Sequence, residues 1–109
     1  GLTLEYGFNN LNLEILPDKF SVMDNYPNPF NPKTIIQYEL PLAENVSIKI
    51  YDSLGRIIYK LQQNNLKPGR HQFIWEGVNQ FGGRVSTGIY FLQLKAGENV
   101  HTQKMMFLK

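Results

Sequence analysis

The 109-residue sequence predicts an all-β protein, an antiparallel β-sandwich. Apolar and polar residues alternate with a period of two in several short stretches, and turn residues separate these stretches about every ten residues. No segment keeps a helical period of about 3.6 residues over three turns. Such alternation places one side of each strand against a core and the other toward solvent. We therefore expect six or seven short strands in two sheets.

Five stretches show the alternation clearly. They cover residues 34–40, 45–52, 56–63, 70–77 and 88–97, with the inward sets Ile36/Tyr38/Leu40, Val46/Ile48/Ile50, Ile57/Tyr59/Leu61, His71/Phe73/Trp75 and Tyr90/Leu92/Leu94. The last stretch, residues 100–109, is apolar on both sides, so its inward set is either Met106 and Leu108 or Met105 and Phe107. A strand of this kind is either central in a sheet or covered by a partner.

The connections between these stretches carry turn chemistry. Asp52 and Gly55 occupy the first and fourth positions of a tight turn that should close a hairpin. Pro68-Gly69 joins a fixed φ to a residue free to take a positive φ, which predicts another turn. Residues 80–83 form a Gly-rich loop, and residues 96–99 should close the final hairpin.

Residues 1–24 differ from the rest of the chain. LTLEY (2–6) and LNLEIL (11–16) alternate, and Pro17-Asp18 then breaks the pattern. We interpret residues 1–24 as a linker or the tail of a preceding domain, with an extra edge strand as the alternative. Residues 25–109 form one domain.

The proline-rich stretch NYPNPFNP (25–32) leads into the strand at Thr34. Proline has no N–H and pushes the residue before it toward extended geometry. We therefore expect a stiff segment, with Tyr26 or Phe30 or both packed on the sandwich. Asn28 and Asn31 should hydrogen-bond to nearby backbone.

Composition limits the possible partners. The chain has 11 basic and 9 acidic residues that are mixed along its length, so nucleic acid is not an expected partner. It lacks an apolar run of about 18 residues, which argues against a membrane-spanning helix. Because cysteine is absent, thiol catalysis, zinc–thiolate sites and iron–sulfur clusters are excluded.

No catalytic or cofactor-binding motif is present. His71 and His101 stand apart in the sequence, and neither belongs to a ligand motif. Asp52 next to Ser53 is interpreted as a turn cap rather than a nucleophile pair. Glu76 and Asn79 offer oxygens, but their spacing does not fit an EF-hand calcium loop. We expect neither an enzyme nor a bound cofactor or metal.

Trp75 is the single tryptophan and is interpreted as a core residue. The alternative is an exposed sugar-stacking face, to which Tyr51, Tyr59 and Phe91 would contribute.

An ordered series of motifs resembles the type A C-terminal sorting domain of type IX secretion. The motifs are YPNPFNPKTIIQYELP (26–41), IYDSLGR (50–56), KPGRHQFIWEG (67–77), STGIYFLQLKAG (86–97) and KMMFLK (104–109). The same signatures are similar to the immunoglobulin-like domain of the flagellar hook-capping protein. The resemblance covers residues 25–109, and the order and spacing of the motifs make it specific.

The resemblance implies a seven-stranded immunoglobulin-like sandwich at the C-terminal end of a larger exported protein from Bacteroidetes-like bacteria. It implies an N-terminal cargo domain in the same chain and recognition by an outer-membrane secretion translocon. The route passes through the periplasm to the cell surface or the medium. In many members a surface peptidase removes the domain and the cargo is attached to the surface.

The family's recurrent positions correspond here to Pro68, Gly69, Gly88, Tyr90, Lys95, Lys104 and Lys109. On the residues alone, lysines on strands also blunt edge-to-edge aggregation, so both interpretations of the lysines stay open. We hypothesise that residues 100–109 carry much of the signal, and that an exposed edge strand allows weak self-association. The alternative function is a non-catalytic accessory module of an extracellular enzyme, either carbohydrate-binding or structural.

Overall fold

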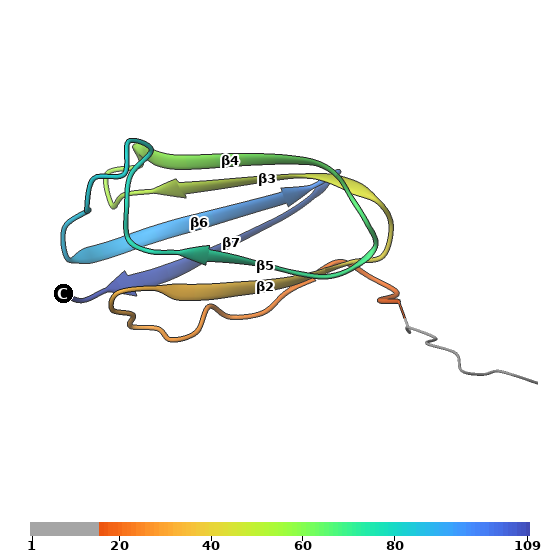
Figure 1. Cartoon of the computed structure of the whole chain (residues 1–109), viewed down its shortest axis with the longest axis horizontal. Coiled ribbons are helices and arrows are strands. Elements are labelled where there is room, and N and C mark those ends of the chain that lie inside the picture. Colours follow the sequence, from red (N-terminus) through yellow and green to blue (C-terminus); the bar gives the residue numbers. More distant parts are fainter. Residues whose placement is uncertain (1–15) are drawn as a thin grey trace, which may run out of the picture.

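The computed structural model describes residues 16–109, which fold into two packed β-sheets (Figure 1). This part of the chain contains seven strands: β1 (Ser21–Val22), β2 (Thr34–Leu40), β3 (Glu44–Tyr51), β4 (Ile57–Leu66), β5 (Gly69–Trp75), β6 (Gly88–Ala96) and β7 (Asn99–Phe107). One sheet has the order β1-β2-β5 and the other the order β4-β3-β6-β7, with every neighbouring pair antiparallel. The predicted antiparallel sandwich is confirmed. LTLEY and residues 11–15 of LNLEIL lie outside the described residues.

The core is built from the alternating residues of the two facing sheets. The fully buried side chains are Phe30, Ile36, Tyr38, Leu40, Val46, Ile48, Ile50, Trp75, Leu92, Leu94, Ala96, Met105 and Phe107. The inward sets expected for β2, β3 and β6 are therefore confirmed, because each of these strands buries every second residue. In β5, Phe73 and Trp75 are buried and His71 is half-buried. Residues 16–109 contain no helix long and apolar enough to cross a membrane.

β7 turns Met105 and Phe107 inward, and both are 0% exposed. This settles the ambiguity of residues 100–109. The strand lies at the edge of its sheet, paired only with β6 among the named strands, so it is not central.

β4 departs from the expected pattern. Ile57 was expected to face inward but is 48% exposed, whereas Ile58 packs against the core. The cause is a bulge, because Ile50 pairs with Tyr59 while Tyr51 pairs with Ile57, which leaves Ile58 without a partner on β3. The extra residue, Ile58, shifts the alternation of β4 by one position. Ile57, which precedes it, therefore points to the outer face of the sheet instead of the core.

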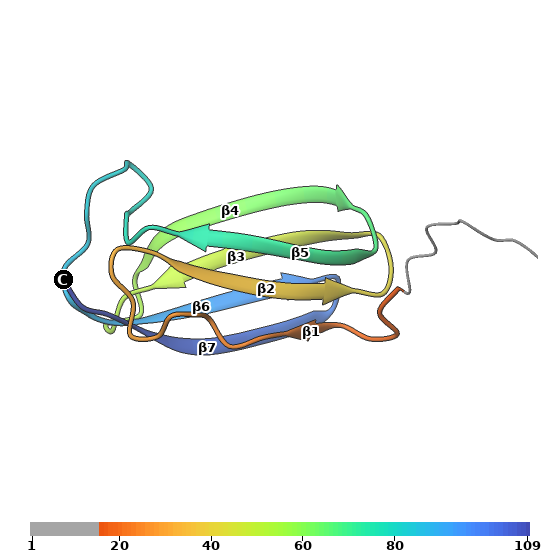
Figure 2. The same cartoon turned by 60° about the horizontal axis from the view of Figure 1, so that its bottom comes forward.

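The predicted turns lie where the sequence placed them. Gly55 adopts a φ of +83° and its N–H donates to the carbonyl of Asp52 at 3.0 Å, which closes the β3–β4 hairpin. Lys67 and Pro68 carry the chain from one sheet to the other, and Gly69 then starts β5 with a φ of +125°. Figure 2 shows the chain before β2 running along the side of the sandwich.

Replacing Phe107 by alanine should lower the free energy of unfolding by about 3–5 kcal/mol, because it opens a cavity in a fully packed core. The matched control is Phe81→Ala, since Phe81 is 94% exposed and its loss should change stability by less than about 0.5 kcal/mol. Urea unfolding of both variants measures the difference. Equal destabilisation of the two would contradict the described core.

Candidate functional site

The outer edge of β7 is covered by residues 25–32, here called the proline seam. The Phe30 N–H donates to the Met106 carbonyl at 2.9 Å, and the Leu108 N–H donates to the Phe30 carbonyl at 3.1 Å. The Asn28 side chain accepts from the Met106 N–H at 2.9 Å and donates to the Lys104 carbonyl at 3.4 Å. These contacts form a parallel bridge along an edge that would otherwise offer free backbone groups. The seam therefore blocks strand addition at the C-terminal half of β7.

The residues on both sides of Asn28 are prolines, which have no backbone N–H to donate to β7. The Asn28 side chain makes the hydrogen bonds to β7 in their place. Its side-chain amide has both a donor and an acceptor and serves in place of backbone. The expectation that Asn28 bonds nearby backbone is wrong, since its partners lie on the last strand. Of the two seam aromatics, Phe30 is 1% exposed and Tyr26 is 78% exposed, so only Phe30 packs on the sandwich. The peptide bonds before all three seam prolines are cis.

A buried polar cluster fixes the start of the seam. The Asn25 amide donates to Thr34 Oγ1 at 3.0 Å, and Thr34 Oγ1 donates to the Pro27 carbonyl at 2.8 Å. Gln103 on β7 donates to Asn25 Oδ1 at 3.0 Å. Both Asn25 and Thr34 are buried, where polar groups need partners. The cluster ties the seam to β2 and β7. Sequence reasoning did not single out Asn25, because nothing local marks it as buried.

Aromatic side chains join the seam to the core. The ring centroids of Phe30 lie 5.4 Å from Trp75 and 5.0 Å from Phe107, and those of Trp75 and Tyr90 lie 5.3 Å apart in an edge-on arrangement. The Trp75 indole donates to the Val78 carbonyl at 2.9 Å. The interpretation of Trp75 as a core residue is confirmed by its exposed fraction of 1%. It therefore cannot stack on a sugar.

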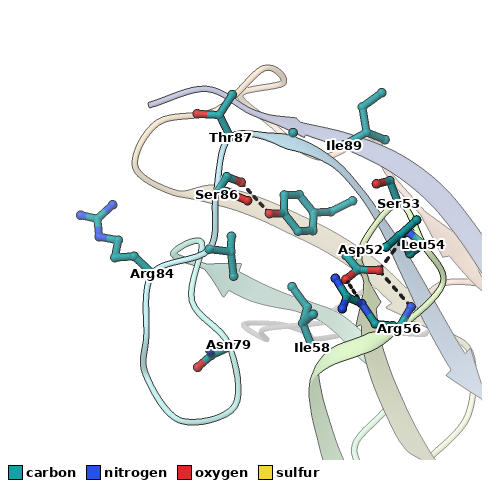
Figure 3. A pocket seen from close by; sticks show the side chains of 13 residues that line it. Asp52, Ser53, Leu54, Arg56, Ile58, Asn79, Arg84, Ser86, Thr87 and Ile89 are labelled. Atoms are coloured by element: carbon teal, nitrogen blue, oxygen red, sulfur yellow. Dashed lines mark hydrogen bonds and ion pairs between the residues drawn. The ribbon is translucent and has the colours of Figure 1, made fainter.

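A pocket of about 280 Å³ opens at the end of the sandwich where β7 finishes (Figure 3). One wall is the β3–β4 turn, in which Asp52 Oδ1 accepts from the N–H groups of Leu54 and Arg56 at 3.0 Å each. Asp52 Oδ2 accepts from Arg56 Nε at 2.7 Å. The backbone hydrogen bond from Arg56, followed by the side-chain contact with Arg56 and the bond from Leu54, lowers the pKa of Asp52 below its usual value. The turn-cap interpretation of Asp52 agrees with these bonds.

The opposite wall of the pocket is the segment that leads into β6. The Tyr90 hydroxyl donates to the Ser86 carbonyl, which holds the ring against this segment. The backbone N–H of Lys109 donates to Thr87 Oγ1 at 3.1 Å, so the last residue is attached to the same wall. Lys109 is thereby held beside Thr87, which lines the pocket together with Gly88 and Tyr90.

The sequence of residues 24–108 matches a family described as "Secretion system C-terminal sorting domain". The chain belongs to this family. The match spans the proline seam, both sheets and β7, and it confirms the resemblance drawn from the motifs. No curated protein is a close match in sequence.

Solved structures similar to this sorting domain share its fold. Dimeric latent PorU from Porphyromonas gingivalis matches with a TM-score of 0.61 at 18% identity, over 92% of this chain and 10% of that one. PorZ of the same organism, described as an essential surface component of its type-IX secretion system, gives 0.55 at 22%, over 84% and 12%. The flagellar hook-capping protein FlgD from Xanthomonas campestris gives 0.55 at 17%, over 84% and 63%. This chain therefore spans about a tenth of PorU.

The seven positions that the resemblance suggested for recognition do not converge on one site of the sorting domain. Gly88 and Tyr90 line the end pocket and Lys109 lies beside it. Pro68 and Gly69 lie at the opposite end, between β4 and β5 (Figure 1). Lys95 and Lys104 are exposed on β6 and β7.

The described residues offer little for chemistry. Within residues 16–109, no group of three or more His, Cys, Asp or Glu side chains could hold a metal ion. In the end pocket, both oxygens of Asp52 already accept hydrogen bonds. Asp52, the carboxylate that lines this pocket, is therefore part of the β3–β4 turn cap.

Replacing Asn28 by alanine should lower the free energy of unfolding by about 1–2 kcal/mol, because it leaves the Met106 N–H and the Lys104 carbonyl without their seam partner. Asn31→Ala is the matched control, since its side chain makes no hydrogen bond within residues 16–109, and should cost less than about 0.5 kcal/mol. Urea unfolding gives both values, and amide hydrogen exchange should be faster at Met106 only in Asn28→Ala. Unchanged exchange at Met106 would contradict the pairing.

The cap formed by Asp52 should depend on pH. Because the folded state lowers the pKa of Asp52, the cap stabilises the fold fully above the unfolded value of 3.8 and loses that contribution as pH falls through the folded value. Asp52→Asn cannot titrate, so the wild type should melt at a higher temperature near neutral pH, and the gap between the two should shrink below about pH 4. Melting curves between pH 7 and pH 2 test this. A gap that stayed constant over the range would refute the assignment.

Proposed function

We propose that this sorting domain is the export signal of a larger bacterial protein, read by the outer-membrane translocon of type IX secretion. The cargo is the N-terminal part of the same protein, which reaches the periplasm first. A surface peptidase then removes the domain, and the cargo is attached to the cell surface or released. The proposal is supported above all by the family match, which spans every motif from the seam to the last strand.

The geometry is compatible with a signal that is read as a folded surface. Of the positions that sequence reasoning assigned to recognition, Lys95, Lys104 and Lys109 are exposed, whereas Tyr90 is buried. The others, Pro68, Gly69 and Gly88, lie at or just before the start of a strand. The exposed lysines can contact a partner without any change in the core.

The alternative function, a carbohydrate-binding module, depended on an exposed Trp75. Loss of sugar binding in a Trp75→Ala variant would not identify a sugar site, because Trp75 is buried between Phe30 and Tyr90. That variant would damage the core rather than a sugar site.

The hypothesis that residues 100–109 carry much of the signal needs a better test than deletion. Removing residues 104–109 would take away Met105 and Phe107, which are both fully buried. Loss of export would then report unfolding rather than loss of recognition. Lys104 and Lys109 are exposed and can be changed without touching the core.

The 109-residue chain, fused to the C-terminus of a reporter, should direct that reporter out of a bacterium that has type IX secretion. Changing Lys104 and Lys109 together to glutamine should lower export about tenfold, the equivalent of about 1.4 kcal/mol of binding free energy. Reporter activity in the medium and at the cell surface measures export, and mass spectrometry of the exported reporter shows whether the domain has been removed.

The control for this experiment is the reporter without the chain, which should stay inside. Export that does not depend on the chain would overturn the proposed function. Normal export of the double glutamine variant would overturn only the role of the terminal lysines. Export of reporter with the domain still attached would remove peptidase cleavage from the proposal.

A further inference from the structure

The outer face of the four-stranded sheet gathers lysines from all four of its strands. Four lysines point to this face: Lys49 on β3, Lys60 on β4, Lys95 on β6 and Lys104 on β7. Lys49 and Lys95 alternate along their strands with residues buried in the core. The register places Lys60 opposite Lys49, and Lys104 opposite Phe91, on the same face. We call this surface the lysine face.

Two of these lysines are direct cross-strand neighbours. Lys49 pairs with Lys60 across β3 and β4, which brings their Cβ atoms to within about 5 Å. Lys95 is also close to this pair, because on β6 it pairs with Ser47, which lies two residues before Lys49 on β3. Like charges placed opposite each other in this way destabilise a sheet. Within residues 16–109, none of the four lysines has an ion-pair partner.

Among the strand positions of this face, the one carboxylate is that of Glu44, the first residue of β3. The other members of the face are neutral: Ser47, Tyr51, Ile57, Gln62, Ile89, Phe91, Gln93, Val100, Thr102 and Met106. Glu44 lies at one end, with its carboxylate over Gly97 in the β6–β7 turn. It borders an open hollow of about 410 Å³ that Lys49 and Lys95 also line. One carboxylate stands against four lysines, and it forms an ion pair with none of them, so most of the positive charge is left for a partner to neutralise.

The lysines adjoin an apolar cluster at the pocket end of the same face. Tyr51 pairs with Phe91 and also with Ile57, and Ile89 pairs with Met106. The β4 bulge turns Ile57 outward, where 48% of it is exposed. Lys104 is the direct neighbour of Phe91. A row of apolar and aromatic side chains beside unpaired cations has the composition of a protein interface with charge selectivity.

We propose that the lysine face binds an acidic surface of a partner protein, with carboxylates opposite the four lysines and apolar side chains opposite Tyr51 and Phe91. This inference rests on the proposed function, in which the translocon supplies that partner. A second copy of this chain fits poorly, because two lysine faces would repel. An anionic glycan or lipid headgroup could meet the lysines but would leave aliphatic Ile57, Ile89 and Met106 unmatched.

The lysine face allows a test in which folding and recognition move in opposite directions. Lys49→Glu replaces the repulsive pair with an attractive Glu–Lys pair, so the domain should melt at the same or a higher temperature. Export of the fused reporter should nevertheless fall at least about fivefold, because close charge pairs across interfaces contribute strongly to binding. Lys49→Arg, which keeps the charge, should export normally.

A charge-matched control separates the effect of the lysine face on export from the effect of net charge. The double variant Lys49→Glu/Lys60→Glu and the control Lys33→Glu/Lys67→Glu both move the formal charge from +2 to −2. Lys33 and Lys67 are exposed in loops outside the face. The first variant should export at least about tenfold less than the second. Equal export of the two would overturn the inference, while export independent of the whole chain would overturn the proposed function instead.

The class of partner is tested with isolated cell envelopes from a type IX-secreting bacterium. The purified 109-residue chain should bind them, and binding should fall about tenfold in Lys49→Glu/Lys60→Glu but not in the control. Pretreating the envelopes with protease should abolish binding. Binding that survives protease would assign the face to a glycan or a lipid and overturn the inference.

Discussion

Packing among Phe30, Trp75, Tyr90 and Phe107 holds together the segments on which every candidate site depends. The four rings come from the proline seam, β5, β6 and β7, so one cluster joins both sheets to the chain that precedes them. Aromatic rings bury large areas and prefer offset or edge-on contacts, which fixes their relative orientation as well as their distance. Gly77 adopts a φ of +70° beside this cluster, and an added Cβ there would lie 3.2 Å from the Phe107 ring. A side chain at this position would therefore have to displace the Phe107 ring by a few tenths of an ångström.

The cluster also decides what is accessible for recognition. Because Phe30 is locked against Phe107, the seam stays on the edge of β7, and the backbone of that strand is not free to pair. Because Tyr90 packs on Trp75, the segment before β6 forms a fixed wall of the end pocket. The surfaces that remain for a partner include the outer faces of the sheets and the edges formed by β4 and β5. The lysine face is one of them, and its geometry follows from the strand register alone.

Much of the fold could be predicted from the sequence because alternation is a local signal. The buried sets of β2, β3 and β6 and the turn at Asp52 follow from residue types a few positions apart. The bulge at Ile58 could not be predicted, because it depends on how β4 pairs with β3. Asn25 was missed, and Asn28 was expected to bond nearby backbone, for a similar reason, since their partners on β7 lie more than seventy residues away. The lysines look evenly mixed with acids along the chain, and only the register collects four of them on one face.

The direction of the seam has a mechanical consequence. The seam and β7 run parallel, and the described chain starts at one end of the sandwich while Lys109 lies at the other (Figure 1). A tension applied between an upstream cargo and the C-terminus would therefore slide the two segments past each other. In such a shear geometry the bonds made by Asn28 and Phe30 carry the load together instead of opening one after another. The arrangement strengthens the domain against tension along the line that would join an upstream cargo to the C-terminus.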